Sequence, residues 1–221
     1  MPRALIAPGE HYHIFNRGVK KDDVFLEEAD YVRMLFLILF LQSDESMFNI
    51  GRYVKNFLRF KTFNIPENTI GNIVKNKSVE LVEFILMPNH FHLLVREVKE
   101  GGISLYLQRV EIAYTKYFNT KYRKSGYLFQ GPYQSVHIES NEQLLHLSAY
   151  IHKNIGEFKK WKDKEYSYRW SSYQYYLGKN GWQGLLVPGI ILGQFKTPEE
   201  YKNFVETSGV KEFDPDLLID P

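Results

Sequence analysis

Four short segments of the chain alternate polar and apolar residues or consist of an apolar run. Segments of roughly four to eight residues with this pattern are typical of β-strands. They are residues 11–17 (HYHIFNR), 79–86 (VELVEFIL), 90–95 (HFHLLV) and 134–138 (QSVHI). Met87-Pro88-Asn89 separates the second segment from the third and has the chemistry of a turn. These two strands are therefore predicted to form a hairpin.

Longer segments between these strands have the spacing of apolar residues expected of helices. The pattern predicts helices over residues 28–42, 53–63, 102–122 and 140–154. Ser140 and Gln143 form a capping-box pattern at the start of the last helix, and Gly156 is placed to stop it. Pro66 and Gly71 predict a loop after the second helix.

The order of these elements is strand, helix, insertion, strand, strand, helix, strand, helix. This order predicts an α+β ferredoxin-like sandwich with a four-stranded antiparallel sheet and an added C-terminal helix. We therefore expect one domain over residues 1–160, with an insertion at about 43–78. The segment that follows is aromatic but aperiodic, so we assign residues 161–221 to a C-terminal extension packed on the domain.

Composition places the chain among globular proteins and excludes several kinds of site. The hydrophobic fraction of 44% is sufficient for a core, and the longest apolar run, Met34–Leu41, is too short to span a membrane. Cysteine is absent, which excludes a disulfide scaffold, a thiolate metal site and a cysteine nucleophile. Residues 1–10 lack the apolar core of a signal peptide. We expect a soluble, cytoplasmic protein without a membrane partner.

Charge is nearly balanced overall, but it is distributed unevenly. A net charge of +2 excludes a uniformly basic nucleic-acid coat protein. Residues 52–77 nevertheless carry six cations against one acid, residues 109–134 carry five against one, and residues 196–221 carry three against seven. The two basic segments are interleaved with Phe and Tyr, which suits single-stranded nucleic acid, although a solvated face beside core aromatics has the same composition. The candidate DNA-binding residues are Arg52, Lys55, Arg59, Lys61, Arg109, Lys116, Lys121, Arg123 and Lys124.

His90 and His92 flank Phe91 at the start of a predicted strand. Because side chains alternate along a strand, both imidazoles are expected on one face and Phe91 on the other. Two imidazoles placed in this way can share one divalent metal, but they can equally be surface or hydrogen-bonded histidines. His11 and His13 have the same spacing, so the pattern alone does not decide.

The helix predicted over residues 140–154 carries a second set of candidate residues. At about 100° per residue, His146, Tyr150 and Asn154 follow one another by one turn along a stripe beside the apolar one. A tyrosine oxygen could attack a phosphate polarised by a metal, while the amide oxygen completes the coordination. The alternative is that Tyr150 is an ordinary half-buried aromatic, and Tyr176 also has an asparagine, Asn180, four residues further on.

The run Phe84–Val95 (FILMPNHFHLLV) resembles the His-hydrophobic-His (HUH) motif of the single-tyrosine transposases. The branch that it resembles most is the REP-associated tyrosine transposases, for which MPNHFH is the most specific part of the match. Further similar segments are His11–Gly18 (HYHIFNRG), Phe129–Val136 (FQGPYQSV), Ala149–Asn154 (AYIHKN) and Trp170–Gly178 (WSSYQYYLG). The insertion at about 43–78 is longer than in compact members of the family.

This resemblance implies an enzyme that binds Mg²⁺ or Mn²⁺ through His90, His92 and Asn154 and uses Tyr150 as its nucleophile. Tyr114 and Tyr117 do not match the position of the family's tyrosine. The implied substrate is single-stranded DNA with a hairpin, which the enzyme cuts and rejoins through a 5′-phosphotyrosine, acting as a monomer or a homodimer. Two other functions are compatible with the residues alone. They are a non-catalytic ferredoxin-like nucleic-acid-binding module and a two-histidine metallohydrolase.

Overall fold

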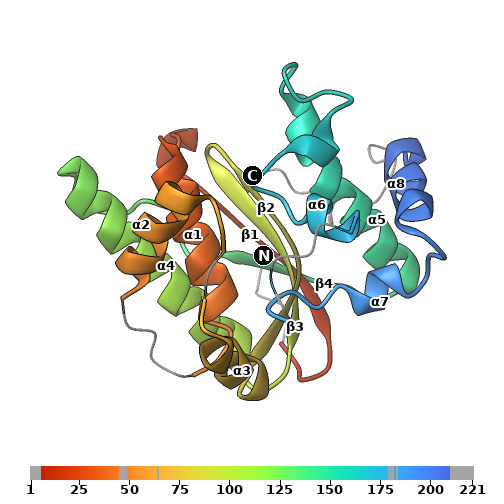
Figure 1. Ribbon diagram of the computed structural model, residues 1–221, viewed down its shortest axis with the longest axis horizontal. Helices are drawn as coiled ribbons and strands as arrows, with labels where there is room; N and C mark the ends of the chain where they lie inside the picture. Colours follow the sequence, from red (N-terminus) through yellow and green to blue (C-terminus); the bar gives the residue numbers. More distant parts are fainter. Residues whose placement is uncertain (1–5, 45–48, 64, 179–181, 183, 210–221) are drawn as a thin grey trace.

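A single antiparallel sheet lies at the centre of the protein in its computed structural model (Figure 1). The structure describes residues 6–44, 49–63, 65–178, 182 and 184–209. Within these ranges the strands are β1 (His11–Arg17), β2 (Val79–Met87), β3 (His90–Glu97) and β4 (Gln134–His137). Their order in the sheet is β2-β3-β1-β4, which is that of a ferredoxin-like fold. The predicted α+β class and four-stranded sheet are confirmed.

Helices lie on both sides of this sheet (Figure 1). One face is covered by α1 (Glu28–Phe40) and α4 (Gly102–Tyr122), with α2 (Ile50–Phe60) and α3 (Glu67–Lys75) beside them. The other face carries α5 (Asn141–Lys153). The remaining elements are 3₁₀ turns η1 (Val19–Lys21), η2 (Asn154–Glu157) and η3 (Glu165–Ser167) and helices α6 (Tyr173–Tyr176), α7 (Gly189–Leu192) and α8 (Pro198–Thr207). Among the helices described, none is long and apolar enough to cross a membrane.

The alternation of side chains in β1 and β3 separates the core from the other face of the sheet. Phe15 lies opposite His92, and Ile14 lies opposite Leu93. Ile14, Phe91 and Leu93 are fully buried and belong to the hydrophobic core. Because successive residues point to opposite faces, His90 and His92 lie together on the face that carries α5. The predicted orientation of the histidine pair is confirmed.

The insertion differs from the prediction. The loop predicted at Pro66 and Gly71 is wrong, because this segment forms α3. Pro66 occupies the N-cap of this helix, and buried Ile70 and Ile73 anchor it to the core, so packing outweighs the weak helix propensity of Gly71. α5 ends at Lys153, within one residue of the predicted end, and Gly156 lies in the 3₁₀ turn η2 that follows.

The proposed extension, described as far as residue 209, covers the outer edge of β2. The backbone N–H of Leu86 donates to the carbonyl of Trp170 at 2.8 Å. The backbone N–H of Val187 donates to the carbonyl of Leu81 at 2.9 Å. These bonds satisfy backbone groups that an open sheet edge would expose. On the α5 side, the hydroxyl of Tyr201 lies 2.6 Å from that of Ser148 and 2.7 Å from Nδ1 of His152.

A buried carboxylate joins the start of α1 to the end of α4. Asp30 is fully buried and accepts hydrogen bonds from Lys121 Nζ at 2.6 Å and from Tyr122 Oη at 2.7 Å. It also accepts from the N–H groups of Leu26 and Glu27, which otherwise lack partners at the start of the helix. Burial alone would raise the pKa of this carboxyl, but the hydrogen bonds outweigh burial and hold its pKa below the usual value.

Asp30→Asn is expected to lower the free energy of unfolding at pH 7 by about 2 kcal/mol, because Lys121 then loses its buried ionic partner and keeps only the exposed Glu27, at 2.6 Å. A carboxyl whose pKa is lowered on folding stabilises the protein above its unfolded pKa of about 4 and loses this effect as the pH falls through the folded value. The gap between variant and wild type should therefore narrow below about pH 4. Urea unfolding at a series of pH values measures it.

Asp44→Asn is the matched control, since Asp44 is exposed and lies 3.3 Å from Lys99. Its effect should stay within about 0.5 kcal/mol. A gap for Asp30→Asn that is the same at pH 7 and pH 3.5 would show that the carboxylate charge is not what stabilises the helix pair.

Candidate active site

The predicted site residues meet between β3 and the C-terminal end of α5. His90 and His92 belong to β3 and Tyr150 belongs to α5. Asn154 directly follows the last residue of α5. The ring of His92 lies 5.0 Å from that of His90 and 5.5 Å from that of Tyr150, measured between centroids. Nε2 of His90 lies 3.3 Å from Oδ1 of Asn154. One chain brings all four side chains together.

The hydrogen bonds of Asn89 determine which nitrogen of His90 carries the proton. Nδ2 of Asn89 donates to the carbonyl of Lys21 at 3.1 Å, so Oδ1 of the same amide faces Nδ1 of His90, at 2.6 Å. An amide oxygen only accepts hydrogen bonds, so Nδ1 of His90 is the donor. Nε2 of a neutral His90 then carries a lone pair, and it faces Asn154.

His92 is held in a similar way from the neighbouring strand. Its Nδ1 lies 2.9 Å from Nε2 of His13, and both rings are fully buried. Nε2 of His92 is buried and has no hydrogen-bond partner. Burial, together with the nearby His90 and His13, lowers the pKa of His92 well below its usual value. The ring is therefore neutral at pH 7, as a metal ligand must be.

These donors fit a small divalent cation. Nε2 of His90 and Oδ1 of Asn154 are both acceptors in the arrangement just described, so their 3.3 Å separation is relieved by a cation that contacts both. Adjacent ligands of an octahedral ion with bonds of about 2.1 Å lie about 3 Å apart. The unpartnered Nε2 of His92 supplies a third donor. Among the described residues, no group of three or more His, Cys, Asp or Glu side chains could hold a metal, so a site here needs the amide.

Tyr150 lies against this donor set and is 8% exposed. Its ring meets His92 edge-on, and the ring of His13 lies 6.2 Å away in a similar orientation. An apolar stripe formed by Leu144, Leu147 and Ile151 of α5 and Ile155 of η2 is buried, and Tyr150 and Asn154 beside it contact the histidines. Tyr114 and Tyr117 have structural contacts instead, donating to the carbonyl of Val24 and to Asp30.

A second buried pair fixes α5 to the sheet behind the site. Glu83 of β2 lies 3.0 Å from Nε2 of His152, and both side chains are fully buried. Burial raises the pKa of Glu83 well above its usual value and lowers that of His152 well below its own. Glu83 therefore contacts the helix that carries Tyr150.

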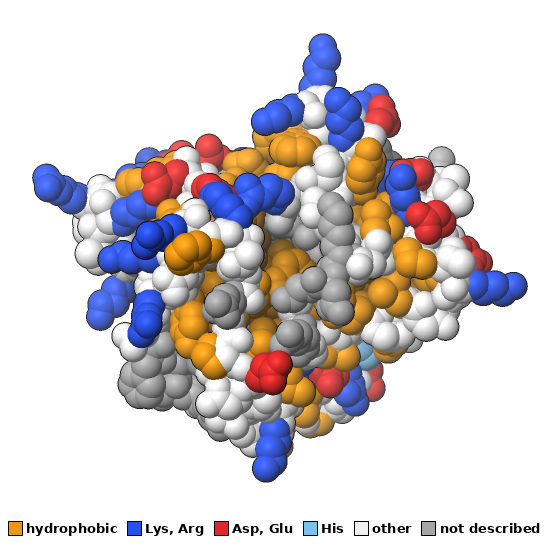
Figure 2. All heavy atoms as spheres, in the orientation of Figure 1, with side chains coloured by type: hydrophobic (Ala, Val, Ile, Leu, Met, Phe, Trp, Pro, Cys, Tyr) orange, Lys and Arg blue, Asp and Glu red, His pale blue; other side chains and the backbone are white. Residues whose placement is uncertain are grey.

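The nine candidate DNA-binding cations fall into two groups. Lys61 pairs with Glu28 at 2.8 Å, Lys121 pairs with Asp30, and Arg109 donates to the carbonyl of Ser43. The other six are exposed; they are Arg52, Lys55, Arg59, Lys116, Arg123 and Lys124. Figure 2 shows Lys and Arg side chains gathered over the flank that α2 and α4 form.

Several contacts bring parts of this flank to the end of the sheet where His90 lies. The N–H of Gly18 donates to the carbonyl of Asn89 at 2.8 Å, and that of Val19 donates to the carbonyl of Leu128 at 3.0 Å. Through Leu128, the loop after α4 thus reaches the end of the sheet at which His90 lies, and Arg123 and Lys124 are at the start of this loop. The N–H of Val24 donates to Pro88 at 2.9 Å, which places the start of α1 there as well.

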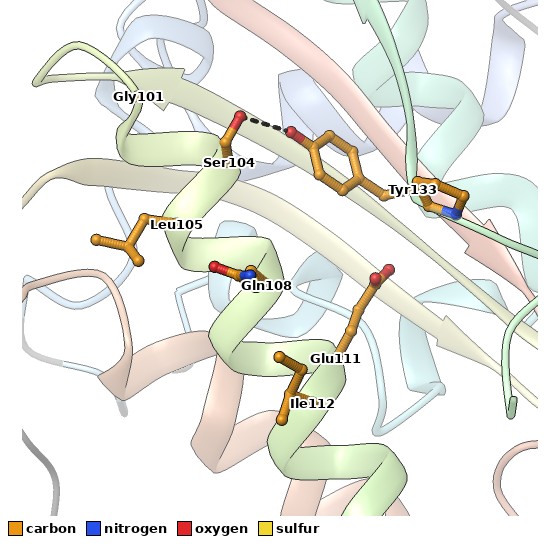
Figure 3. Close-up of a pocket in the computed structure, with 8 residues that line it drawn as sticks. Gly101, Ser104, Leu105, Gln108, Glu111, Ile112 and Tyr133 are labelled. Atoms are coloured by element: carbon orange, nitrogen blue, oxygen red, sulfur yellow. Dashed lines mark hydrogen bonds between the residues drawn. The ribbon is translucent and has the colours of Figure 1, made fainter. Parts of the chain in front are cut away.

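A groove of about 530 Å³ runs along the outer side of α4 (Figure 3). Ser104 and Tyr133, whose hydroxyls lie 3.1 Å apart, line it together with the exposed Leu105 and Ile112. Its one charged residue, Glu111, accepts a hydrogen bond from Asn16 at 2.7 Å. None of the four site residues lines this groove, so it is separate from the histidine site.

Sequence reasoning missed the two residues that hold the imidazoles, His13 and Asn89. The His-x-His spacing of His11 and His13 was visible, but it did not reveal that His13 lies beside His92. The sequence-based list of DNA-binding candidates also missed four exposed cations that follow α5. They are Lys159, Lys160, Lys162 and Lys164. A local count of charge over this segment would have found them.

Two comparisons with known proteins found similarities to transposases. Residues 49–154 match the sequence profile of the family described as "Transposase IS200 like". Among solved structures, the chain is similar to a REP-associated tyrosine transposase bound to a REP hairpin, with 12% sequence identity and a TM-score of 0.54. That alignment covers 81% of this chain and 86% of the other, and at this identity it establishes the shared fold. No curated protein matches the chain.

Metal binding tests the donor set directly. We expect the purified protein to bind Mn²⁺ and expect His92→Ala and Asn154→Ala each to weaken binding more than about tenfold, because each removes a donor. Electron paramagnetic resonance of free Mn²⁺ in a titration measures the affinity. His137→Ala, which removes an imidazole paired with Glu10 at the surface, is the control and should bind as wild type does. Equal affinity in all four proteins would refute the assignment of the site.

Proposed function

We propose that the protein is a metal-dependent DNA strand transferase of the IS200-like transposase family, whose sequence profile residues 49–154 match. Its substrate is single-stranded DNA that bears a hairpin, and it works in the cytoplasm as a single-stranded DNA endonuclease that rejoins what it cuts. The observation that carries the proposal is the meeting of Tyr150 with His90, His92 and Asn154 in one buried site.

The proposed reaction exchanges one phosphodiester for another. The oxygen of Tyr150 attacks the scissile phosphorus, the bond to the 3′ oxygen breaks, and the tyrosine proton is lost while the departing oxygen gains one. The products are a 5′-phosphotyrosine and a 3′-hydroxyl, and attack by a 3′-hydroxyl reverses the step without ATP. The Mg²⁺ or Mn²⁺ that His90, His92 and Asn154 would hold supplies polarisation of the phosphate when bound.

The protein positions these groups before any reaction occurs. Nδ1 of His90 is held by Asn89, so its Nε2 faces Asn154. The buried Glu83–His152 pair joins α5, and with it Tyr150, to β2. A tyrosine with a pKa near 10 is a poor nucleophile at pH 7, so the reaction depends on this positioning and on the cation.

We propose that the exposed cations hold the DNA around the site. Arg123 and Lys124 follow α4 at the end of the sheet that carries His90, and Arg59 lies near the start of α1 through the Lys61–Glu28 pair. The solved relative binds a REP hairpin, which supports a hairpin as the ligand here. Since one chain supplies all four site residues, a monomer is sufficient for cleavage, and a homodimer is not required.

Tyr150→Phe is expected to abolish the covalent product. Wild-type protein mixed with labelled hairpin oligonucleotides and Mn²⁺ should form an SDS-resistant adduct, and the variant should bind the same DNA without forming it. Tyr127→Phe is the control, because Tyr127 is 92% exposed and should leave adduct formation unchanged.

Other results of this experiment would favour other functions. An adduct that survives Tyr150→Phe would refute the nucleophile. Cleavage without an adduct would favour the two-histidine metallohydrolase, and binding without cleavage across varied hairpins would favour the non-catalytic module.

Reversing charge beside the site should weaken DNA binding. We expect Arg123→Glu/Lys124→Glu to lower hairpin affinity about tenfold or more and to reduce the slope of log K against log[salt] by about 1.4, because two phosphate contacts are lost. Lys75→Glu/Lys196→Glu is the matched control, since it makes the same change of net charge at exposed positions on α3 and before α8. Fluorescence anisotropy at several salt concentrations measures both. Equal losses in the two variants would show a general effect of net charge.

A further inference from the structure

His13 is a fully buried imidazole beside the candidate metal site, and the function proposed above gives it no role. Nε2 of His13 lies 2.9 Å from Nδ1 of His92, and the two rings stack at 5.1 Å with an interplanar angle of 22°. The contact joins β1 to β3 across 79 residues of sequence.

The hydrogen bond between these rings has two possible directions. If His13 donates from Nε2, then His92 accepts at Nδ1 and its proton lies on Nε2, which points into the site. If His92 donates from Nδ1, its Nε2 carries a lone pair. A metal ligand requires the second arrangement, since the coordinating nitrogen must be unprotonated.

The neighbouring histidine shows the same arrangement with a different partner. Nδ1 of His90 donates to Oδ1 of Asn89, whose orientation is fixed by its own bond to the carbonyl of Lys21. Both imidazoles thus have Nδ1 engaged by a neighbouring side chain. Nε2 of His90 faces Asn154, and Nε2 of His92 is buried without a hydrogen-bond partner. For His92, the atom in the position of the Asn89 oxygen is Nε2 of His13.

We propose that His13 is a positioning residue that accepts a hydrogen bond from Nδ1 of His92 and so keeps Nε2 of His92 available to a divalent cation. This role rests on the proposed function, because it assumes that His92 is a metal ligand. His13 makes no contact with the cation itself. Its effect is on the tautomer and orientation of the ligand, as for partners that hold metal-bound histidines in general.

Two substitutions separate this role from simple packing. The side-chain oxygen of glutamine reaches about the position of Nε2 in histidine and can accept the bond, whereas phenylalanine keeps an aromatic ring and offers no acceptor. We therefore expect His13→Phe to weaken Mn²⁺ binding by about 10- to 100-fold and His13→Gln to stay within about threefold of wild type. Electron paramagnetic resonance of the protein without DNA measures this affinity independently of activity.

The tautomer of His92 provides a second measurement, made without metal. ¹⁵N-histidine NMR should show His92 protonated at Nδ1 in the wild type and in His13→Gln, and protonated at Nε2 in His13→Phe. Thermal unfolding of the three proteins compares the loss of packing, which by itself would lower the Mn²⁺ affinity of both variants together.

The outcomes distinguish this proposal from the function on which it rests. If the wild type binds Mn²⁺ and His13→Phe binds it with equal affinity, the proposed role of His13 is wrong and the metal site is unaffected. The same conclusion holds if both variants lose affinity equally. Wild-type protein that binds no Mn²⁺ would overturn both. A selective loss in His13→Phe, accompanied by the change of tautomer, is the result expected.

Discussion

The pairing of β1 with β3 at one register is the constraint on which the candidate site depends. With Phe15 opposite His92 and Arg17 opposite His90, the histidines of both strands share one face of the sheet. A slip of one residue would turn His90 and His92 into the hydrophobic core and place Phe91 and Leu93 on the face that carries α5. The core would then hold two polar imidazoles without partners, which disfavours the slipped register. The apolar residues between the histidines therefore determine where the histidines point.

The same sheet also positions the tyrosine, through contacts that carry no net charge. Glu83 and His152 are buried between β2 and α5, where burial disfavours the charged form of each, raising the pKa of Glu83 and lowering that of His152. Tyr201 of α8 contacts His152 and Ser148 from the other side. The extension thus contributes to the placement of Tyr150, although it lies after the segment that matches the transposase family.

Local pattern was sufficient to predict the strands, the main helices and the shared face of His90 and His92, because these depend on the alternation of neighbouring residues. The contact between His13 and His92 could not be predicted, since it depends on the register of two strands that are distant in sequence. Similarly, composition marked Lys121 as a DNA contact, but its ammonium pairs with Asp30, 91 residues away. The helix at Glu67–Lys75 was missed because tertiary packing of Ile70 and Ile73, and not propensity, stabilises it.

Cations and acids are nearly balanced in number, but they have different roles in different parts of the described structure. Lys121 and Asp30 compensate each other where α1 meets α4, whereas Arg52, Lys55, Arg59, Lys116, Arg123 and Lys124 remain exposed. The groups proposed for chemistry are the imidazole, phenol and amide side chains between the sheet and α5. The groups proposed for DNA binding are cations of α2, of α4 and of the loop after α4, which belong to the other helical layer. Salt screens the exposed cations strongly and the buried site weakly. Ionic strength should therefore act on DNA capture and not on the geometry at Tyr150, which makes the two functions separable in the same protein.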